Sequence, residues 1–477
     1  TFLDDITAYG FSGSNIHLEN PFDVDEHYQN IKTYFVVAGN LSLRGKEECS
    51  PAALLTAAAA NGGSKAPYFA DDPQDLENEL KAALNMIRSG GYAGPTASVY
   101  SAGPNSGGAV YRSRFWSAVE AASGTDGPTA ADSQVTWIGD VNALLMDADG
   151  KLYEDTDANS ALNTVDEQVS IYHDIDADGP RACSQEPEAD GTCMGQVKPL
   201  DRVNHLWSAA EWLASMPDTD VNTNRQEYIS ETRKRFIFTW NDLDNNGAVA
   251  ENEMLPFVPL KDWCGPQLSV AANRAPIPAD FGVNSTGEVN DIISWLRGLD
   301  IPGDSYRRSR QVDLPSNFSL DNDPEIITWR LGDIIHSTPT VVADPKEKYH
   351  QLYEDEAYAA FATAHFHRRH VIYFGGNDGM VHAVNGGFYD PARRKFWRGH
   401  DPDTGLYSDT GPELGAELWA YVPYNLLPHL KRLTRKGYQH TYFVDLTPRV
   451  FDVQIFDSSP DSLGHVHGWG TIMVVGM

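Results

Sequence analysis

The clearest alternation between apolar runs and polar turns lies in residues 329–423. Four apolar runs rich in β-branched and aromatic residues occur there, at 338–343, 370–375, 380–384 and 418–422. Asn377-Asp378-Gly379 separates the second run from the third, which is the spacing of a tight hairpin. Four antiparallel strands of this kind form one blade of a β-propeller, and a single blade cannot bury both of its faces. The pattern therefore predicts neighbouring blades.

A shorter copy of the same pattern follows. The segment 446–450 (LTPRV) matches 337–341 (STPTV), and 469–476 matches the strand that begins at 369. The copy reaches Met477 at the point where Asn-Asp-Gly stands in the first copy. We expect an incomplete propeller of about one and a half blades over 326–477. The alternative is an isolated β-meander with a coincidental Thr-Pro repeat.

The first 91 residues have a different pattern. Short apolar runs at 33–39 and 68–70 are typical of buried strands, and each is followed by a helical stretch, near 50–62 and 72–91. The order strand–helix–strand–helix predicts parallel strands in an α/β layer.

The middle of the chain is richer in Gly, Ser, Pro and Asp, with short β runs at 109–111, 135–138, 141–146 and 169–172. Helical patterns occur at 206–215, 227–240 and 289–299. The fold class that follows is multidomain α+β. We expect four parts: an α/β part over 1–91, a β-rich domain over 92–235, a loop and linker over 236–325, and the incomplete propeller over 326–477.

The net charge of the chain argues against one class of function, the binding of nucleic acid. The net charge of −31 argues against nucleic acid, which requires clustered Lys and Arg. It fits a secreted protein, and one that binds cations. No apolar run has the length of a transmembrane helix. The chain has no initiator Met and no signal peptide, and we expect that it begins and ends inside domains.

The strongest motif with chemistry lies at 242–253. It reads D-x-D-x-N-G-x5-E, the pattern of a twelve-residue EF-hand-type calcium loop. Calcium requires six to eight oxygen ligands, and the expected ligands are Asp242, Asp244, Asn246, the backbone carbonyl of Ala248, and Glu253. Gly247 permits the sharp turn. The alternative is an Asn/Asp/Gly turn without a ligand.

The context predicts a structural clip. We expect a helix over 228–240 before the loop, whereas Pro256 limits any helix after it. A single hand of this kind is expected to fix the junction before the propeller. Two other Asp-rich turns, which start at Asp147 and Asp174, lack a carboxylate at the twelfth position.

The four cysteines form no Cys-x-x-Cys motif, which removes support for zinc-ribbon, thioredoxin-like and covalent haem proteins. Cys183 and Cys193 bracket a short acidic loop and are expected to form a local disulfide. Cys49 and Cys264 are then the remaining pair. An even number of cysteines suits an oxidising compartment.

Several motifs resemble the PilY-type tip adhesins and assembly factors of bacterial type IV pili. They are GDIIHSTP at 332–339, YFGGNDGMVHA at 373–383, AYVP at 420–423, YFVD at 442–445 and LLMDADGKLYED at 144–155. The resemblance covers 110–477 well and 1–91 more loosely.

The resemblance implies an extracellular, non-enzymatic adhesin and pilus assembly factor, exported through the periplasm to the pilus tip. Its propeller would bind minor pilins, and residues 1–91 would be the last part of a von Willebrand factor A-like domain. The D-x-S-x-S metal motif of that domain is not in this sequence. Calcium-dependent control of the pilus would rest on the loop at Asp242.

Two other functions stay open at this point. Val381-His382-Ala383 with the later Trp397 distantly resembles the repeat of a quinoprotein-type propeller dehydrogenase. A calcium-stabilised surface protein unrelated to pili is the third possibility.

Overall fold

The computed structural model describes most of the chain from residue 97 onward and short parts before it. The described residues are 36–38, 55–59, 68–70, 97–101, 107–121, 134–173, 180–187, 193–227, 231, 233–242, 246, 253–259, 278–300, 307–314, 325–458 and 465–477. The chain divides into two compact units, 1–90 with 174–179, and 91–173 with 180–477.

The described residues of the first unit form two short strands and a helix over 55–59. β1 (Val36–Ala38) and β2 (Tyr68–Ala70) pair in parallel, with Val36 opposite Tyr68. A helix between two parallel strands is the arrangement that the order of apolar runs predicts. The helix predicted over 72–91 lies outside the described residues.

The second unit begins with a five-stranded antiparallel sheet in the order β10-β5-β4-β3, with β6 also paired to β5. Its strands are β3 (Ala97–Ser101), β4 (Gly108–Glu120), β5 (Gln134–Met146), β6 (Leu152–Tyr153) and β10 (Trp207–Ser208). The predicted runs 135–138 and 141–146 are thus one strand. Helix α4 (Ala209–Ala214) is shorter than the predicted 206–215, because Trp207 and Ser208 pair with β5.

A smaller sheet lies next in sequence. β7 (Ser170–His173), β8 (Pro180–Cys183) and β9 (Val197–Pro199) are antiparallel, and the 3-10 turn η1 (Leu200–Arg202) follows. A disulfide joins Cys183, at the end of β8, to Cys193. Cys49 and Cys264 lie outside the described residues.

A seven-stranded sheet positions the candidate site. Its order is β12-β11-β21-β17-β16-β15, with β18 also paired to β17. The strands are β11 (Ile237–Trp240), β12 (Met254–Pro256), β15 (Thr340–Val342), β16 (His370–Gly376), β17 (Met380–Asp390), β18 (Lys395–Trp397) and β21 (Glu417–Tyr421). All four strands predicted from the alternation in 329–423 are present. Asn377-Asp378-Gly379 forms the turn between β16 and β17, where Gly379 has φ 89°.

The helix predicted over 227–240 is wrong at its C-terminal end, where residues 237–240 form strand β11. Ile237 and Thr239 are buried, whereas Phe238 and Trp240 are partly exposed on the opposite face. Burial therefore alternates with a period of two, and the β-branched and aromatic side chains of these four residues fit a half-buried strand. β11 pairs in parallel with β21, so this segment extends the sheet.

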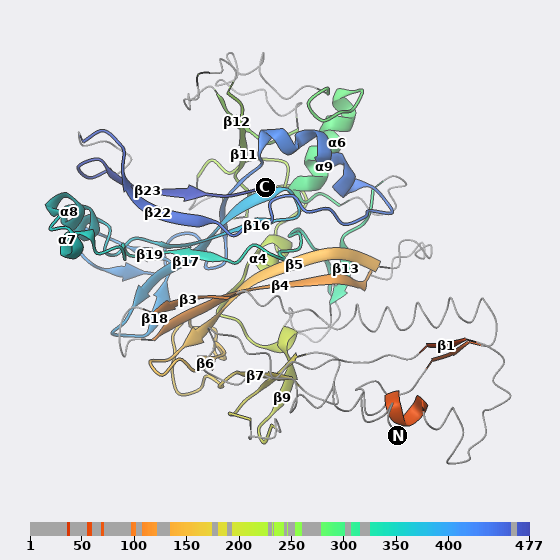
Figure 1. Cartoon of the computed structure of the whole chain (residues 1–477), viewed down its shortest axis with the longest axis horizontal. Coiled ribbons are helices and arrows are strands. Elements are labelled where there is room, and N and C mark those ends of the chain that lie inside the picture. Colours follow the sequence, from red (N-terminus) through yellow and green to blue (C-terminus); the bar gives the residue numbers. More distant parts are fainter. Residues whose placement is uncertain are drawn as a thin grey trace. The chain divides into compact units, whose positions relative to one another are not determined.

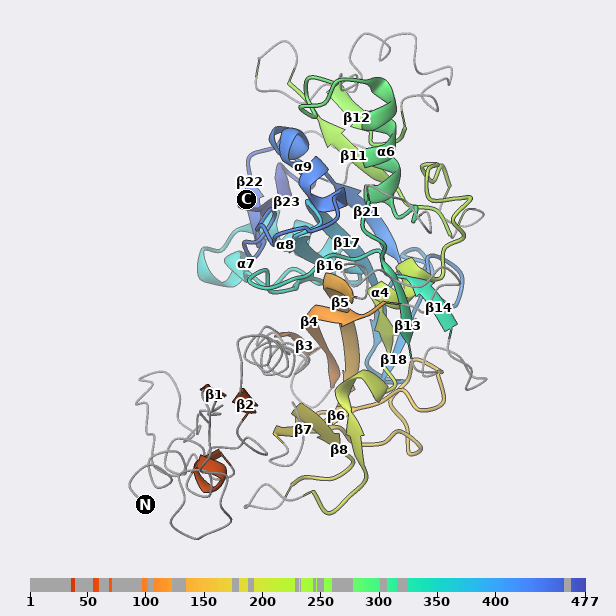
Figure 2. The same ribbon diagram turned by 90° about the vertical axis from the view of Figure 1, so that its right-hand side faces the viewer.

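Two helices cover part of this sheet. α6 (Thr286–Arg297) packs with α9 (Leu427–Thr434), and both contribute to a core that includes Ile237, Met380 and Ala420 of the strands. Figures 1 and 2 show α6 beside β11 and β12. Ser285 begins α6 by accepting a hydrogen bond from the amide of Glu288, and Gly298, with φ 126°, ends it.

The same face of the seven-stranded sheet, further along β16 and β17, shares a core with the five-stranded sheet. Tyr111 of β4 and Trp207 of β10 belong to one apolar cluster with Ile372 and Phe374 of β16. Shorter elements complete the unit: β13 (Gln311–Leu314) with β14 (Glu325–Thr328), β19 (Gly399–His400) with β20 (Tyr407–Ser408), α7 (Tyr349–Leu352), α8 (Glu356–Ala364) and the 3-10 turn η4 (Tyr424–Leu426).

The two copies of the Thr-Pro repeat lie side by side. The amide of Thr338 donates to Oγ1 of Thr447 at 2.9 Å, and Oγ of Ser337 donates to the carbonyl of Leu446 at 3.2 Å. Both pairs have the same sequence separation of 109 residues. After the second copy, β22 (Arg449–Gln454) and β23 (Trp469–Val474) form an antiparallel pair. The repeat therefore continues as a second, smaller sheet.

The packing of β16 against the segment just before the second copy can be tested at Gly375. A Cβ at Gly375 would overlap the backbone carbonyl of Val444, which cannot move as a side-chain end could. We expect Gly375→Ala to lower the free energy of unfolding by about 1–3 kcal/mol, measured by urea denaturation.

Gly287→Ala is the matched control. Gly287 lies in the first turn of α6, and the nearest atom to a Cβ there would be Oγ of Ser285 at 3.8 Å. This substitution should be neutral, or stabilising by up to about 1 kcal/mol, because Ala favours a helix over Gly. Equal effects of the two substitutions would contradict the close packing at Gly375.

Candidate functional site

The loop at 242–253 closes a β-hairpin. β11 and β12 are antiparallel with Trp240 opposite Met254, and the amide of Asn241 donates to the carbonyl of Glu253 at 3.2 Å. The first and last residues of the twelve-residue motif, Asp242 and Glu253, therefore stand at the same end of the hairpin. The expected entering helix is absent at residues 237–240, and the motif is held by strands.

Three of the five expected ligands are described. Oδ1 of Asp242 accepts a hydrogen bond from the amide of Asn246 at 3.1 Å, which folds the start of the loop back on its first carboxylate. Glu253 is buried, with 1% of its surface exposed. Asp244 and Ala248 lie outside the described residues. Calcium binding at this loop therefore stays a prediction.

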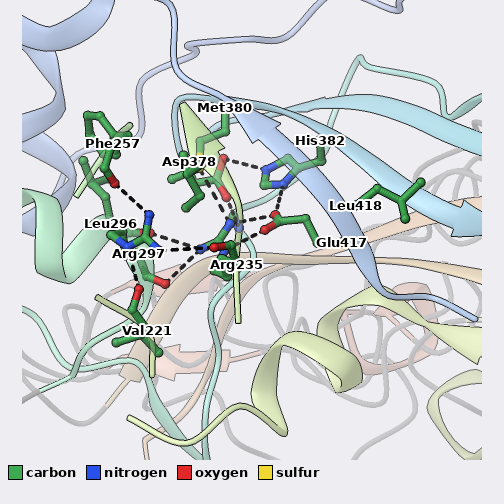
Figure 3. A network of polar contacts seen from close by, with 12 residues as sticks. Val221, Arg235, Phe257, Leu296, Arg297, Asp378, Met380, His382, Glu417 and Leu418 are labelled. Atoms are coloured by element: carbon green, nitrogen blue, oxygen red, sulfur yellow. Dashed lines mark hydrogen bonds and ion pairs between the residues drawn. The ribbon is translucent and has the colours of Figure 1, made fainter. Parts of the chain in front are cut away.

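A buried ion pair anchors this hairpin to the sheet. Arg235, two residues before β11, donates from Nε and Nη2 to the two carboxylate oxygens of Glu417, both at 2.8 Å. The side chains are 0% and 1% exposed. A two-pronged contact of this kind fixes direction as well as distance. Figure 3 shows Arg235 between Glu417, on β21, and the end of α6.

His382 extends the network to the β16–β17 turn. Its Nδ1 lies 2.9 Å from Oε1 of Glu417, and its Nε2 lies 3.2 Å from Oδ1 of Asp378. The other oxygen of Asp378 accepts from the amide of Gly332 at 3.2 Å. Both ring nitrogens therefore face carboxylates, as Figure 3 shows.

The charged neighbours of His382 and Glu417 shift the pKa values of both side chains. Burial alone would lower the pKa of His382, but the adjacent carboxylates of Asp378 and Glu417 outweigh it and raise that pKa to about 9. Burial likewise opposes ionisation of Glu417, yet Arg235 and His382 hold its pKa well below the usual range. At neutral pH the network consists of an imidazolium, a guanidinium and two carboxylates.

Arg297 ties the surrounding segments together from the last turn of α6. Its guanidinium donates to the carbonyl of Phe257 at 2.7 Å, to Oδ1 of Asn224 at 2.9 Å and to the carbonyl of Val221 at 2.5 Å. Arg235 in turn donates from Nη1 to the carbonyl of Arg297 at 3.0 Å, so it caps the C-terminal end of α6. Burial is the largest cause that lowers the pKa of Arg297, to about 9.

An acidic cluster lies elsewhere, in the β6–β7 connection. Carboxylate oxygens of Asp155, Asp157 and Asp166 lie within 4.8 Å of one another. Counted from Asp155, the segment reads D-x-D-x-N with Asp166 at the twelfth position, whereas a count that starts at Asp147 does not find this pattern. Backbone amides of the loop already bind Asp155 and Asp166. Burial raises the pKa of Asp155 to about 6. Such clusters also form without a cation, and this one carries no calcium assignment.

The network makes stability depend on pH in a defined direction. The folded pKa of His382 lies above its ordinary value of 6.5, so its contribution is fully present below pH 6.5 and is lost as pH rises through about 9. We expect the free energy of unfolding to fall over that range by a component on the order of 3 kcal/mol, measured by urea denaturation at a series of pH values.

His382→Gln should remove this component and flatten the profile between those pH values. His367→Gln is the control, because His367 is exposed. A profile of equal slope in the wild type and in His382→Gln would contradict the assignment.

Several known type IV pilus proteins are similar to the chain. It is 29% identical over 296 residues, 60% of its length, to the type IV pilus biogenesis factor PilY1 of Pseudomonas aeruginosa strain UCBPP-PA14. It is 31% identical over 253 residues, 52% of its length, to PilY1 of strain PAK. A PilY1 homolog of Xylella fastidiosa strain Temecula1 is 32% identical over 156 residues, 32% of the chain.

The chain spans a small part of these relatives, 18%, 16% and 10% of their lengths respectively. No family model and no solved structure matches it. These matches confirm the resemblance seen in the sequence motifs: the chain is similar to PilY1 proteins over about half of its length.

Proposed function

We propose that the chain is part of an extracellular type IV pilus tip adhesin and assembly factor without enzymatic activity, in which a calcium loop orders the start of a propeller. The observation that carries the proposal is the similarity to PilY1 over 60% of the chain. Among the described residues, no helix is both long enough and apolar enough to cross a bilayer. The proposed partners are minor pilins at the pilus tip, and the proposed location is the cell surface.

Calcium binding is proposed at Asp242, Asp244, Asn246, Ala248 and Glu253. Without a cation, the carboxylates of this loop repel one another in a confined space. Bound calcium would hold the two ends of the loop together and so favour the paired β11–β12 hairpin. Because β11 pairs with β21 and Arg235 binds Glu417, the ordering would extend into the seven-stranded sheet.

The surface beside the loop is suited to this role. A hollow of about 560 Å³ opens next to Asp242, and it is lined mainly by aromatic and apolar side chains of the same face of the sheet, including Phe238, Trp240, Trp419 and Tyr421. The state of the loop would therefore affect the shape of an apolar face.

We further propose that β15, β16, β17 and β21 are the four strands of a first propeller blade. The side-by-side contacts between the Thr-Pro repeats, at a constant separation of 109 residues, support this, since successive blades are related by a sequence repeat. The parallel pair β1–β2 supports, at a coarser level, an α/β domain of the von Willebrand factor A type over 1–91.

The quinoprotein alternative is less well supported. His382 lies at the centre of that resemblance, but it is 1% exposed and bound to carboxylates at both ring nitrogens. This histidine is engaged in holding the sheet and is not presented to a cofactor. The similarity to PilY1 argues against a surface protein unrelated to pili.

Terbium luminescence tests the calcium loop. Tb³⁺ replaces Ca²⁺ at oxygen-rich sites, and Trp240, two residues before Asp242, can sensitise its emission. We expect Asp242→Ala to lose most of the sensitised emission that added calcium displaces. Asp409→Ala is the control, because the Asp409 side chain is 66% exposed and pairs only with Lys395 at 3.6 Å in the described part of the chain. Undiminished emission from Asp242→Ala would contradict the site.

Co-purification tests the pilus assignment separately. A tagged chain expressed with the minor pilins of a type IV pilus system should retain them on an affinity column, with calcium present and with less retention after chelation. A negatively charged globular protein with the same tag is the control. Consistent absence of minor pilins would count against the pilus role, even if terbium binds as expected.

A further inference from the structure

A small cavity lies among β5, α6 and the turn between β16 and β17. It is enclosed by Trp137 of β5, Trp295 of α6 and the segment around Gly332, and its volume is about 20 Å³. That volume has room for about one water molecule or one ion of similar size.

An arginine with an unused donor lines this cavity. Arg310 is 5% exposed, and its guanidinium stacks on the ring of Trp295 at 3.7 Å from the ring centre. Nη2 donates to the carbonyl of Trp295 at 2.5 Å. Nε is buried and has no hydrogen-bond partner in the described part of the chain. A buried charged donor without an acceptor costs stability, so the cavity is expected to hold an acceptor.

Two further arginines line the same cavity. Arg308 donates to the backbone carbonyls of Leu433 and Thr136, and no carboxylate ion pair of Arg308 is found among the described residues. Arg330 pairs with Asp218, whose side chain is 48% exposed. Carbonyl groups satisfy hydrogen-bond donors, but they do not neutralise a charge.

The charges that line the cavity do not balance among the described residues. Three of the lining side chains are arginines, Arg308, Arg310 and Arg330, and two are carboxylates, Asp333 and Asp378.

Two carboxylates also line the cavity, and both are engaged with other donors. Asp333 accepts from Nδ2 of Asn377 at 2.7 Å and lies 2.8 Å from Nε2 of His440. Asp378 is bound to His382 and to the amide of Gly332. The donor without a partner therefore belongs to Arg310, and the lining carboxylates do not accept from it.

We propose that this cavity binds one small monovalent anion of chloride size, held by Nε of Arg310 and by the positive charges of Arg308 and Arg330. The anion would compensate the excess charge and connect α6, the segment 307–310 and β5. A water molecule is the competing occupant, since it could accept from Nε but would leave the charge uncompensated.

Two measurements on the unmodified chain distinguish an anion from water. Crystals grown in bromide should show an anomalous bromine peak within hydrogen-bond distance of Arg310 Nε. In solution, ³⁵Cl resonance lines should be broadened by the protein, and bromide should reverse the broadening. A cavity without a bromine peak, together with chloride lines no broader than with a protein lacking such a cavity, would overturn the proposal.

Stability gives the third readout. At constant ionic strength set with methanesulfonate, each tenfold increase in chloride above its dissociation constant should add about 1.4 kcal/mol to the free energy of unfolding. Arg310→Gln should lose this dependence. Arg393→Gln, at an arginine that is 67% exposed, should keep it. If Arg310→Gln does not fold, the bromine peak decides, and a chloride dependence that is equal in Arg310→Gln and the wild type would contradict the site.

Discussion

The buried ion pair between Arg235 and Glu417 is the contact on which the arrangement of the site depends. Taking both charges out of water is costly, and the structure offsets that cost with two parallel hydrogen bonds, with His382 on the carboxylate and with carbonyl groups on the guanidinium. Each partner belongs to a different segment: the start of β11, the start of β21, β17 and the end of α6. The pair therefore sets where the hairpin sits, because a displaced hairpin would leave a charge buried without its partner.

This anchoring changes the role that an EF-hand-type loop can have. In a helical sensor, calcium changes the angle between two helices. Here the loop joins two strands of an existing sheet, and Asp242 and Glu253 lie at the loop end of that hairpin. A cation at this point can tighten or release the strand pairing, but it has no pair of helices to open. A structural clip with local control of the adjacent apolar face is therefore the role that we propose for this loop.

The sequence predicts the parts of the fold that depend on local patterns. Alternation in 329–423 predicts the strands, Asn377-Asp378-Gly379 predicts the hairpin, and the Thr-Pro repeat predicts a second sheet. The sequence predicts a helix where β11 lies, because residues 237–240 follow a charged stretch with a helical pattern. Residues 237–240 form a strand instead because they pair with β21, which lies far along the chain. The network could not be predicted, since Arg235 and Glu417 are 182 residues apart and isolated charges in a sequence do not identify their partners. The acidic cluster at Asp155 could have been found by counting the motif from each Asp in turn.

The central claim is that calcium at the loop orders the sheet through β11 and the Arg235–Glu417 pair. Hydrogen–deuterium exchange with and without calcium tests it most directly, because it reports on β11, β12 and β21 separately. In the wild type, calcium should slow exchange in the hairpin and also in β21, and in Glu417→Gln the slowing should be confined to the hairpin. Exchange in wild-type β21 that is unchanged by calcium, while the loop itself becomes protected, would contradict the account.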